Sequence, residues 1–167
     1  KIRSVIEHLQ EMEKIIQGIT QLTKKGDPDE EFKLETIVNR GVQLMNRRLD
    51  RNNVECIIEG ENFKVSSNPR AIVLILMNMI DNSIYWLTKN RKDNRKLKIL
   101  IKELTNHYAL IISDNGPGFD DGLEIITLPF YTSKIGGMGL GLFICKRTYE
   151  SHDLELQLFD QNEISGL

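Results

Sequence analysis

Apolar side chains recur at alternating steps of three and four residues along the first part of this chain. They stand at Ile2, Val5, Leu9, Met12, Ile16 and Ile19. This heptad spacing predicts a helix, and the additional Ile6 and Ile15 favour a helical bundle or a dimer interface. A single amphipathic helix lying on its own domain is the alternative. The expected linker, residues 26–33, follows and begins with a polar run at 26–31.

Beyond the linker, the apolar positions change from helical spacing to strand spacing. A second helix is predicted from Leu34 to Leu49. Its expected buried residues are Ile37, Val38, Val42, Leu44 and Met45. Short strands are predicted at Val54–Ile58 and Phe63–Val65, on either side of a polar turn at 59–62.

An asparagine followed by a proline starts the most apolar segment of the chain. Asn68 is a good helix cap, and Pro69 suits the first helical position, where no amide donor is needed. Residues 71–77 are apolar on nearly every side. The helix, which should reach about Leu87, is therefore expected to be buried.

The rest of the pattern mixes strands and helices. A hairpin is predicted from Lys96–Leu104 and Tyr108–Ser113, followed by an aperiodic loop at 119–137. A helix is predicted at 139–151 and a strand at Leu154–Phe159. This order predicts an α+β fold of two layers, in which helices cover one face of a mixed β-sheet.

Composition indicates the class of protein and its cellular environment. The 167 residues are 40% hydrophobic and 28% charged, and the net charge of -2 does not suggest nucleic-acid binding. Cys56 and Cys145 match no metal or redox spacing, which favours a reduced, cytoplasmic environment. No apolar run approaches ~18 residues, and no signal peptide is visible. The chain is expected to be a piece of a longer protein, which could itself be attached to a membrane.

Two asparagines interrupt the apolar helix. Asn78 and Asn82 share one helix face, about 6 Å apart along the axis, and Asp81 stands beside the second. A buried amide needs partners, and its carbonyl oxygen is a hard ligand that suits Mg²⁺. The alternative is that the pair bonds to neighbouring backbone or to a buried water.

A carboxylate ends the last hairpin strand, directly before a first glycine cluster. Asp114 could accept a hydrogen bond from the exocyclic amine of a base, because an ionised carboxylate only accepts. Gly116 and Gly118 would let the backbone bend and approach a ring closely. An ordinary turn is the alternative for the same residues.

A second glycine cluster opens the next predicted helix. At a helix start, Gly137, Gly139 and Gly141 would expose amides that a phosphate could satisfy, whereas close helix packing is the alternative. Lys134 lies just before them and could close over phosphates, or it could be an ordinary solvated lysine. Together the two clusters predict a nucleotide site.

In this order, the motifs resemble those of the ATP-binding family shared by gyrase, the heat-shock chaperone, histidine kinases and mismatch-repair ATPases. Residues 78–83 correspond to its N box, 114–118 to its first glycine box, 129–134 to its F box and 137–142 to its second glycine box. The resemblance covers about residues 32–167 and implies the Bergerat ATP-binding fold.

The resemblance also implies roles for the matched residues. Asn82 would bind Mg²⁺, Asp114 would hold the adenine amino group, and residues 119–137 would form a lid over ATP. Gly116 and Gly118 would line the base pocket, while Gly139 and Gly141 would meet the phosphates. The other expected ATP contacts are Asn78, Phe130, Thr132, Lys134, Gly137, Met138, Leu140 and Leu142. The expected catalytic residues are Asn78, Asn82 and Lys134.

Position 78 separates the branches of this family. The ATPase branches typically carry a glutamate there as a general base, and Asn78 cannot accept a proton at neutral pH. Phosphoryl transfer depends mainly on positioning and charge neutralisation, so a kinase can work without that base. The resemblance therefore favours a histidine kinase that passes the γ-phosphoryl group of ATP to a histidine. The rivals are an ATPase of the gyrase, chaperone or mismatch-repair kind, a serine-directed relative, and a nucleotide-gated interaction module.

The histidine-kinase resemblance also implies an organisation and partners. Residues 1–25 would end a dimerisation and phosphotransfer helix, and 34–167 would be the catalytic domain, with its last strand truncated. A homodimer through the helix and a response-regulator receiver domain are the expected partners. His8 lacks the context of a phosphoacceptor, which is expected outside this chain. Many kinases carry a basic residue shortly after the Mg²⁺ asparagine, whereas residues 84–86 follow here without one, so Lys134, Lys89 or another residue would have to supply that phosphate contact.

Overall fold

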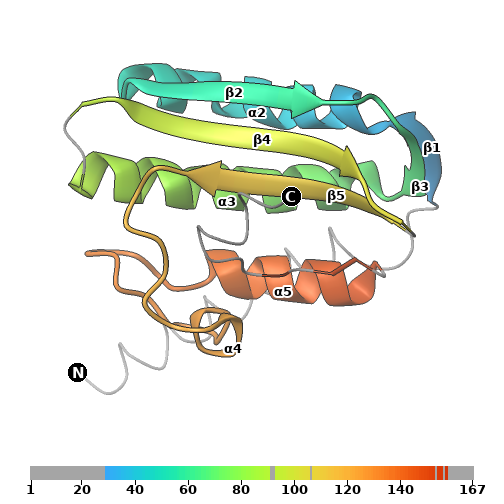
Figure 1. The fold of residues 1–167 in the computed structure, drawn as a ribbon. Helices are drawn as coiled ribbons and strands as arrows, with labels where there is room; N and C mark the ends of the chain where they lie inside the picture. Colours follow the sequence, from blue (N-terminus) through green and yellow to red (C-terminus); the bar gives the residue numbers. More distant parts are fainter. Residues whose placement is uncertain (1–28, 91–92, 106, 153, 156, 158–167) are drawn as a thin grey trace. The chain divides into compact units, whose positions relative to one another are not determined.

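A computed structural model of the chain describes residues 29–90, 93–105, 107–152, 154–155 and 157 (Figure 1). These residues belong to two compact units, of which one ends at Asp121 and the other begins at Gly122. The predicted N-terminal helix, residues 1–25, lies outside the described residues. Half of the strand predicted at Leu154–Phe159, residues 156, 158 and 159, lies outside them as well, and its described residues, Leu154, Glu155 and Gln157, are not part of a strand.

A three-stranded mixed sheet forms the centre of the first unit (Figure 1). Strand β4, Arg95–Glu103, lies between β2, Val54–Gly60, and β5, Tyr108–Asp114. Strands β2 and β4 are parallel, and β4 and β5 are antiparallel. Both the predicted hairpin and the mixed sheet are therefore confirmed.

The two faces of the sheet differ because side chains alternate along a strand. On one face, Leu97, Ile99 and Ile101 of β4 are buried. On the other face, Lys96 and Lys98 of the same strand form ion pairs with Glu55 and Glu59 of β2, at 3.7 and 2.7 Å. One face thus belongs to the core, and the other presents paired charges.

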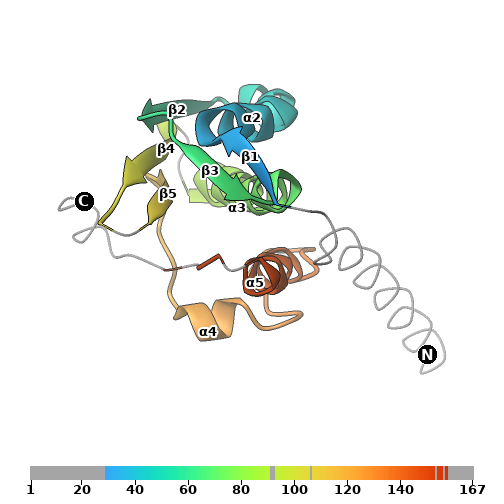
Figure 2. The same ribbon diagram turned by 90° about the vertical axis from the view of Figure 1, so that its right-hand side faces the viewer.

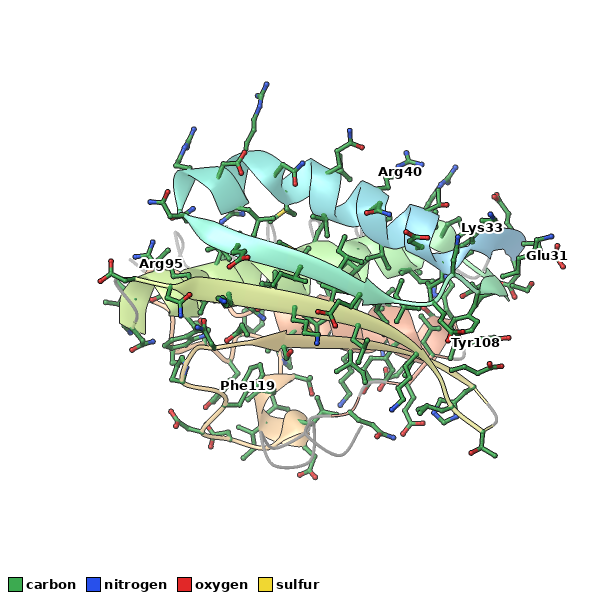
Figure 3. All side chains as sticks on the ribbon, turned by 45° about the horizontal axis from the view of Figure 1, so that its top comes forward. Glu31, Lys33, Arg40, Arg95, Tyr108 and Phe119 are labelled. Carbon is green, nitrogen blue, oxygen red and sulfur yellow. The ribbon has the colours of Figure 1, made fainter. Side chains whose placement is uncertain are left out.

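Arg95 and Tyr108 mark the two ends of the sheet (Figure 3). At one end, the Tyr108 ring lies 4.9 Å from the ring of Phe63. The register pairs Glu103 with Tyr108 and Leu97 with Asp114, so Asp114 lies at the opposite end, near Arg95. The Asp114 carboxylate is therefore the last side chain in a row that faces the core side of the sheet.

Two helices, α2 at Leu34–Arg51 and α3 at Pro69–Asn90, cover the apolar face of this sheet (Figure 2). Helix α3 begins as predicted: the Asn68 side-chain oxygen accepts hydrogen bonds from the amides of Arg70 and Ala71, at 3.0 and 3.1 Å. This cap satisfies two amides that the helix itself leaves without partners.

Helix α3 is the main apolar element of the first unit. Its Leu76, Ile80 and Leu87 side chains are fully buried, and each such burial contributes about 1.5–3 kcal/mol. By length and composition alone, this helix passes as a membrane span. A core helix passes the same test, and α3 packs against α2, β4 and β5.

Helix α2 confirms its predicted position but not all of its predicted buried side. Leu34, Ile37, Val38, Met45 and Leu49 are buried and Val42 is half-buried, whereas Leu44 is 57% exposed. At 100° per residue, Leu44 lies about 90° from the centre of that stripe, so its assignment to the core is wrong. Arg40 points away from the sheet on the outer side of α2 (Figure 3).

A second, two-stranded sheet was not anticipated from the sequence. Strand β1, Glu30–Lys33, lies within the predicted linker and pairs antiparallel with β3, Lys64–Ser67. Strands β2 and β3 both exist as predicted, but they pair with β4 and β1 rather than with each other. Gly60, with φ of +113°, allows the chain to leave β2 against the Ile101 backbone, where a Cβ would clash.

The second unit contains helices α4, Leu123–Ile126, and α5, Gly141–Ser151. The short α4 lies inside the segment predicted to be an irregular loop. Helix α5 begins two residues after its predicted start because Gly139 has a φ of +68°, which a helix excludes. Cys145 is fully buried in α5, and burial raises the pKa of its thiol to about 12, so the thiol stays protonated at neutral pH.

Candidate nucleotide site

The Asp114 carboxylate is fixed by one hydrogen bond to each of its oxygens. The Ser83 hydroxyl of α3 donates to Oδ2 at 2.6 Å, and the Gly116 amide donates to Oδ1 at 2.9 Å. Each carboxylate oxygen has two lone pairs and can accept a second bond. Asp114 is therefore an oriented acceptor at the end of β5.

Gly116 is required by the closeness of this carboxylate. A Cβ built at position 116 would lie 2.7 Å from Asp114 Oδ1 and 3.7 Å from Leu87 Cδ2. Gly118 has a φ of +81°, a backbone conformation that glycine adopts without strain. The first glycine cluster thus turns the chain sharply at the carboxylate.

The two asparagines of α3 have different surroundings. The Asn78 side-chain amide donates to the Leu74 carbonyl at 2.9 Å, one turn back along the helix. Among the described residues, the Asn82 amide makes no hydrogen bond, and Asp81 pairs instead with Arg48 of α2. The Asn78 side chain is thus bonded to its own helix. The Asn82 side-chain carbonyl oxygen is available to a ligand.

The last turns of α3 carry an aromatic and basic group. The Lys89 ammonium lies 5.0 Å from the Trp86 ring centroid and 5.9 Å from that of Tyr85. A cation over a ring face is attracted by the ring quadrupole. The Lys89 charge is therefore held about one helical turn after Tyr85. Residues 84–86, which follow the N box directly, include no basic residue.

In the second unit, the F box and the second glycine box meet through their backbones. The Phe130 amide donates to the Gly139 carbonyl at 3.0 Å. A Cβ at Gly139 would lie 2.5 Å from the Phe130 carbonyl carbon and 2.7 Å from the Tyr131 oxygen. Phe130 itself has a φ of +66°, which is costly for an aromatic residue. Only a glycine at 139 allows this approach.

A second contact joins the same two motifs. The Lys134 amide donates to the Thr132 hydroxyl oxygen at 3.0 Å, and the Gly137 amide donates to the Lys134 carbonyl at 3.0 Å. A Cβ at Gly137 would lie 2.9 Å from both Thr132 Oγ1 and Lys134 Cβ. The backbone around Lys134 is therefore folded into a tight turn.

Helix α5 starts at the end of the second glycine box. Leu140 precedes it and is buried, Gly141 and Leu142 are its first residues, and Met138 is 60% exposed. A leucine side chain offers no oxygen to cap the helix, and the first amides of a helix have no partner within it. An anion is the natural partner for such amides.

The predicted site residues therefore fall into two groups, each within its own unit. Asn78, Asn82, Asp114, Gly116 and Gly118 belong to the first unit, and the residues from Phe130 to Leu142 belong to the second. Ser83, which is only 6% exposed, is a site residue that was not predicted from the sequence. Its signal is a hydroxyl among the buried positions of α3, because a buried hydroxyl needs a partner.

This arrangement, a mixed sheet with helices on one face, matches solved catalytic domains of histidine kinases. The chain belongs to the family described as histidine kinase-, DNA gyrase B- and HSP90-like ATPase, whose model matches residues 67–165. This match includes the four motifs from the N box to the second glycine box.

Individual relatives agree with this assignment. The catalytic domain of histidine kinase ThkA is 27% identical, with a TM-score of 0.63 over 73% of this chain and 80% of that one. A complex of histidine kinase ThkA with the response regulator protein TrrA has a TM-score of 0.59 and 23% identity, over 79% of this chain and 40% of that one. The signal transduction histidine-protein kinase/phosphatase MprB of Mycobacterium ulcerans (strain Agy99) is 25% identical over 165 residues, 93% of this chain. The chain spans 31% of that relative's length.

Proposed function

We propose that this chain is the ATP-binding catalytic part of a histidine kinase, which binds Mg-ATP and transfers its γ-phosphoryl group to a histidine. In this transfer, a P–N bond forms at the imidazole, and the bond from the γ-phosphorus to the β,γ-bridging oxygen breaks to release ADP. The acceptor histidine would lie outside this chain.

The surroundings of Asn78 carry this choice among the functions of the family. Its amide nitrogen donates to the Leu74 carbonyl at 2.9 Å, so the side chain is anchored, and an amide is not a base at neutral pH. A water molecule near the γ-phosphate would therefore lack a proton acceptor at this position. Phosphoryl transfer to a well-placed nucleophile depends on positioning and charge neutralisation instead.

Adenine recognition is assigned to Asp114. Ser83 and Gly116 hold its two oxygens, which leaves lone pairs to accept from the exocyclic amine of the base. A hydrogen bond to an ionised acceptor is about twice as strong as a neutral one. The carboxylate would thus favour a purine with an amino group at position 6.

Magnesium is assigned to Asn82. No group of three or more His, Cys, Asp or Glu side chains among the described residues could hold a metal by itself. Mg²⁺ commonly takes one or two protein oxygens and completes its shell with water and phosphate oxygens. The Asn82 carbonyl, without a hydrogen-bonding partner among the described residues, fits that requirement. When bound, the ion would neutralise phosphate charge.

Phosphate binding is assigned to the second glycine box, with Lys134 as a point charge and residues 119–137 as the lid. The first amides of α5, from Gly141 onward, are the proposed donors. Phe130, Thr132, Gly137, Met138, Gly139, Leu140 and Leu142 would shape the backbone around the triphosphate. Lys89 of the first unit, held over Trp86, is a further proposed cation for the phosphates.

The proposed partners follow from this function. A receiver domain fits because the ThkA histidine kinase, which shares the fold, forms a complex with the response regulator protein TrrA. Homodimerisation through residues 1–25 and a cytoplasmic location are also part of the proposal. The heptad spacing of residues 2–19 supports the dimer.

A labelling experiment tests the proposal. The full parent chain is incubated with ATP labelled in the γ-phosphate, and the product is examined for acid-labile, base-stable phosphoprotein. Label on a protein histidine is the expected result. Free phosphate alone would favour the ATPase, and binding without turnover would favour a nucleotide-gated interaction module.

A further inference from the structure

The antiparallel pairing of β4 and β5 continues beyond its last regular pair in an unusual way. The ladder ends with Leu97 opposite Asp114, so Lys96 and Asn115 would be next. The Asn115 amide does donate to the Lys96 carbonyl, at 3.1 Å. The return bond from the Lys96 amide goes to the Asn115 side-chain oxygen at 2.9 Å, rather than to its backbone carbonyl.

The nitrogen of the same side chain is also engaged. Asn115 Nδ2 donates to the Asn94 carbonyl at 2.7 Å, and Asn94 has a φ of +53°. One side-chain amide therefore bridges two residues at the start of β4, accepting from one and donating to the other. It takes the place of a backbone peptide group in the sheet.

Because the Asn115 side chain accepts the bond from the Lys96 amide in place of the backbone carbonyl, the main chain after Asn115 can leave the sheet. The next residue, Gly116, turns back, and its amide donates to Asp114 Oδ1 at 2.9 Å. If the backbone carbonyl of Asn115 were bound in the ladder, the chain would continue along β4. The Gly116 amide would then have to reach the carboxylate from an extended conformation.

We infer that Asn115 is a positioning residue: its side-chain amide, bonded to Asn94 and Lys96, sets the turn that aims the Asp114 carboxylate at the base. The inference rests on the proposed nucleotide function and adds a specificity-determining residue to it. An asparagine fits because the bridge needs a donor and an acceptor on one short side chain. Aspartate keeps the acceptor but loses the donor, and alanine loses both.

Two variants test the inference in calorimetric titrations with ATP and with purine riboside triphosphate, which lacks the 6-amino group. Asn115→Ala should weaken ATP about tenfold, the effect of losing roughly one well-oriented hydrogen bond, and should leave purine riboside triphosphate within about twofold. Asn115→Asp preserves the shape of the side chain and should lower the ATP preference in the same direction. The selectivity ratio is the readout, because general loosening of the fold would weaken both nucleotides alike.

The matched control is Asn52→Ala. Asn52 also donates its side-chain amide to a backbone carbonyl, that of Arg48 at 2.7 Å, and its own carbonyl accepts a bond from Arg95 at the start of β4. This variant should leave the selectivity ratio unchanged. If the unsubstituted chain prefers ATP and both Asn115 variants keep that preference, the positioning role is overturned while the proposed function stands. If the unsubstituted chain binds neither nucleotide, both proposals fail.

Discussion

The residues assigned to the base and those assigned to the phosphates are held in different ways. Asp114 lies at the end of a strand, and side-chain and backbone donors fix both of its oxygens. Phe130 and Gly139 lie in a loop, joined by a backbone hydrogen bond, and both have positive φ. One group is built on regular elements and the other on strained backbone.

The difference extends to exposure. Ser83 and Leu87 beside the carboxylate are buried, whereas many large apolar side chains of the second unit are exposed. The exposed residues are Ile125, Leu128, Phe130, Tyr131, Ile135 and Met138. Segments with few buried apolar contacts open at lower cost than core elements. We therefore expect base selectivity to be built into the folded first unit, and triphosphate affinity to depend on the backbone of a weaker segment.

The largest expected effect comes from a change that disrupts only the residues assigned to the phosphates. In Gly139→Ala, the new Cβ would meet the Phe130 carbonyl carbon at 2.5 Å, and its φ of +68° would be strained. Backbone rearrangement costing about 3 kcal/mol would lower ATP affinity about a hundredfold and leave adenosine affinity nearly unchanged. Calorimetry with both ligands measures this split.

Gly122→Ala is the control for that loop. Gly122 has a φ of -69°, and an added Cβ would meet nothing within 4 Å. ATP affinity should remain within about twofold of the unsubstituted chain. Equal losses of adenosine and ATP in Gly139→Ala would contradict the division between the two groups.

Disrupting the residues assigned to the base should have the next largest effect. Asp114→Asn keeps the size of the side chain but removes the charge and one acceptor, so ATP affinity should fall about thirtyfold. Purine riboside triphosphate should be much less affected. Asp50→Asn, on the exposed side of α2, is the control. Unchanged ATP affinity in calorimetry would argue against the assignment of Asp114 to the base.

The metal assignment predicts a smaller, conditional effect. Asn82→Ala should weaken ATP about tenfold in the presence of Mg²⁺ and hardly at all in the presence of a chelator, because only the metal contact is lost. Asn46→Ala, exposed on α2, should change neither value. Equal weakening with and without Mg²⁺ would refute a metal role for Asn82.

The smallest expected effect concerns Ser83, which holds the carboxylate assigned to the base. Ser83→Ala removes the donor to Asp114 Oδ2 and should lower ATP affinity about fivefold, within the usual worth of one hydrogen bond. Combined with Asp114→Asn, the two losses should not add, because both act on one contact. Additive losses would mean that Ser83 acts independently of the carboxylate.

The sequence predicted the elements of strong local pattern and missed those that depend on distant partners. Helix α3 follows from its Asn68 cap and apolar run, and the hairpin of β4 and β5 from its alternation. Strand β1 contains Glu30, Glu31, Phe32 and Lys33, which alone resemble a linker, and becomes a strand only by pairing with β3. Leu44 looks like a core residue by composition, but the axis of the packed stripe leaves it exposed.

The candidate site shows the same division. Asp114, Asn82 and the glycines are candidates from the sequence alone because each motif is contiguous. Ser83 and Asn115 were not, since their roles depend on contacts with residues 31 and 21 positions away. A hydroxyl or an amide in a motif does not reveal its partner before the chain is folded.

The parallel alignment of β2 and β4 has a consequence for how this site assembles. The chain must travel through β3 and α3 before it returns to β2, so this pairing closes late and over a long distance. Docking of that crossover is also the step that brings Ser83 to Asp114. The Asp114 carboxylate would therefore acquire its orientation only when the core is complete, and a newly made or partly unfolded chain would lack the proposed base acceptor in its oriented form.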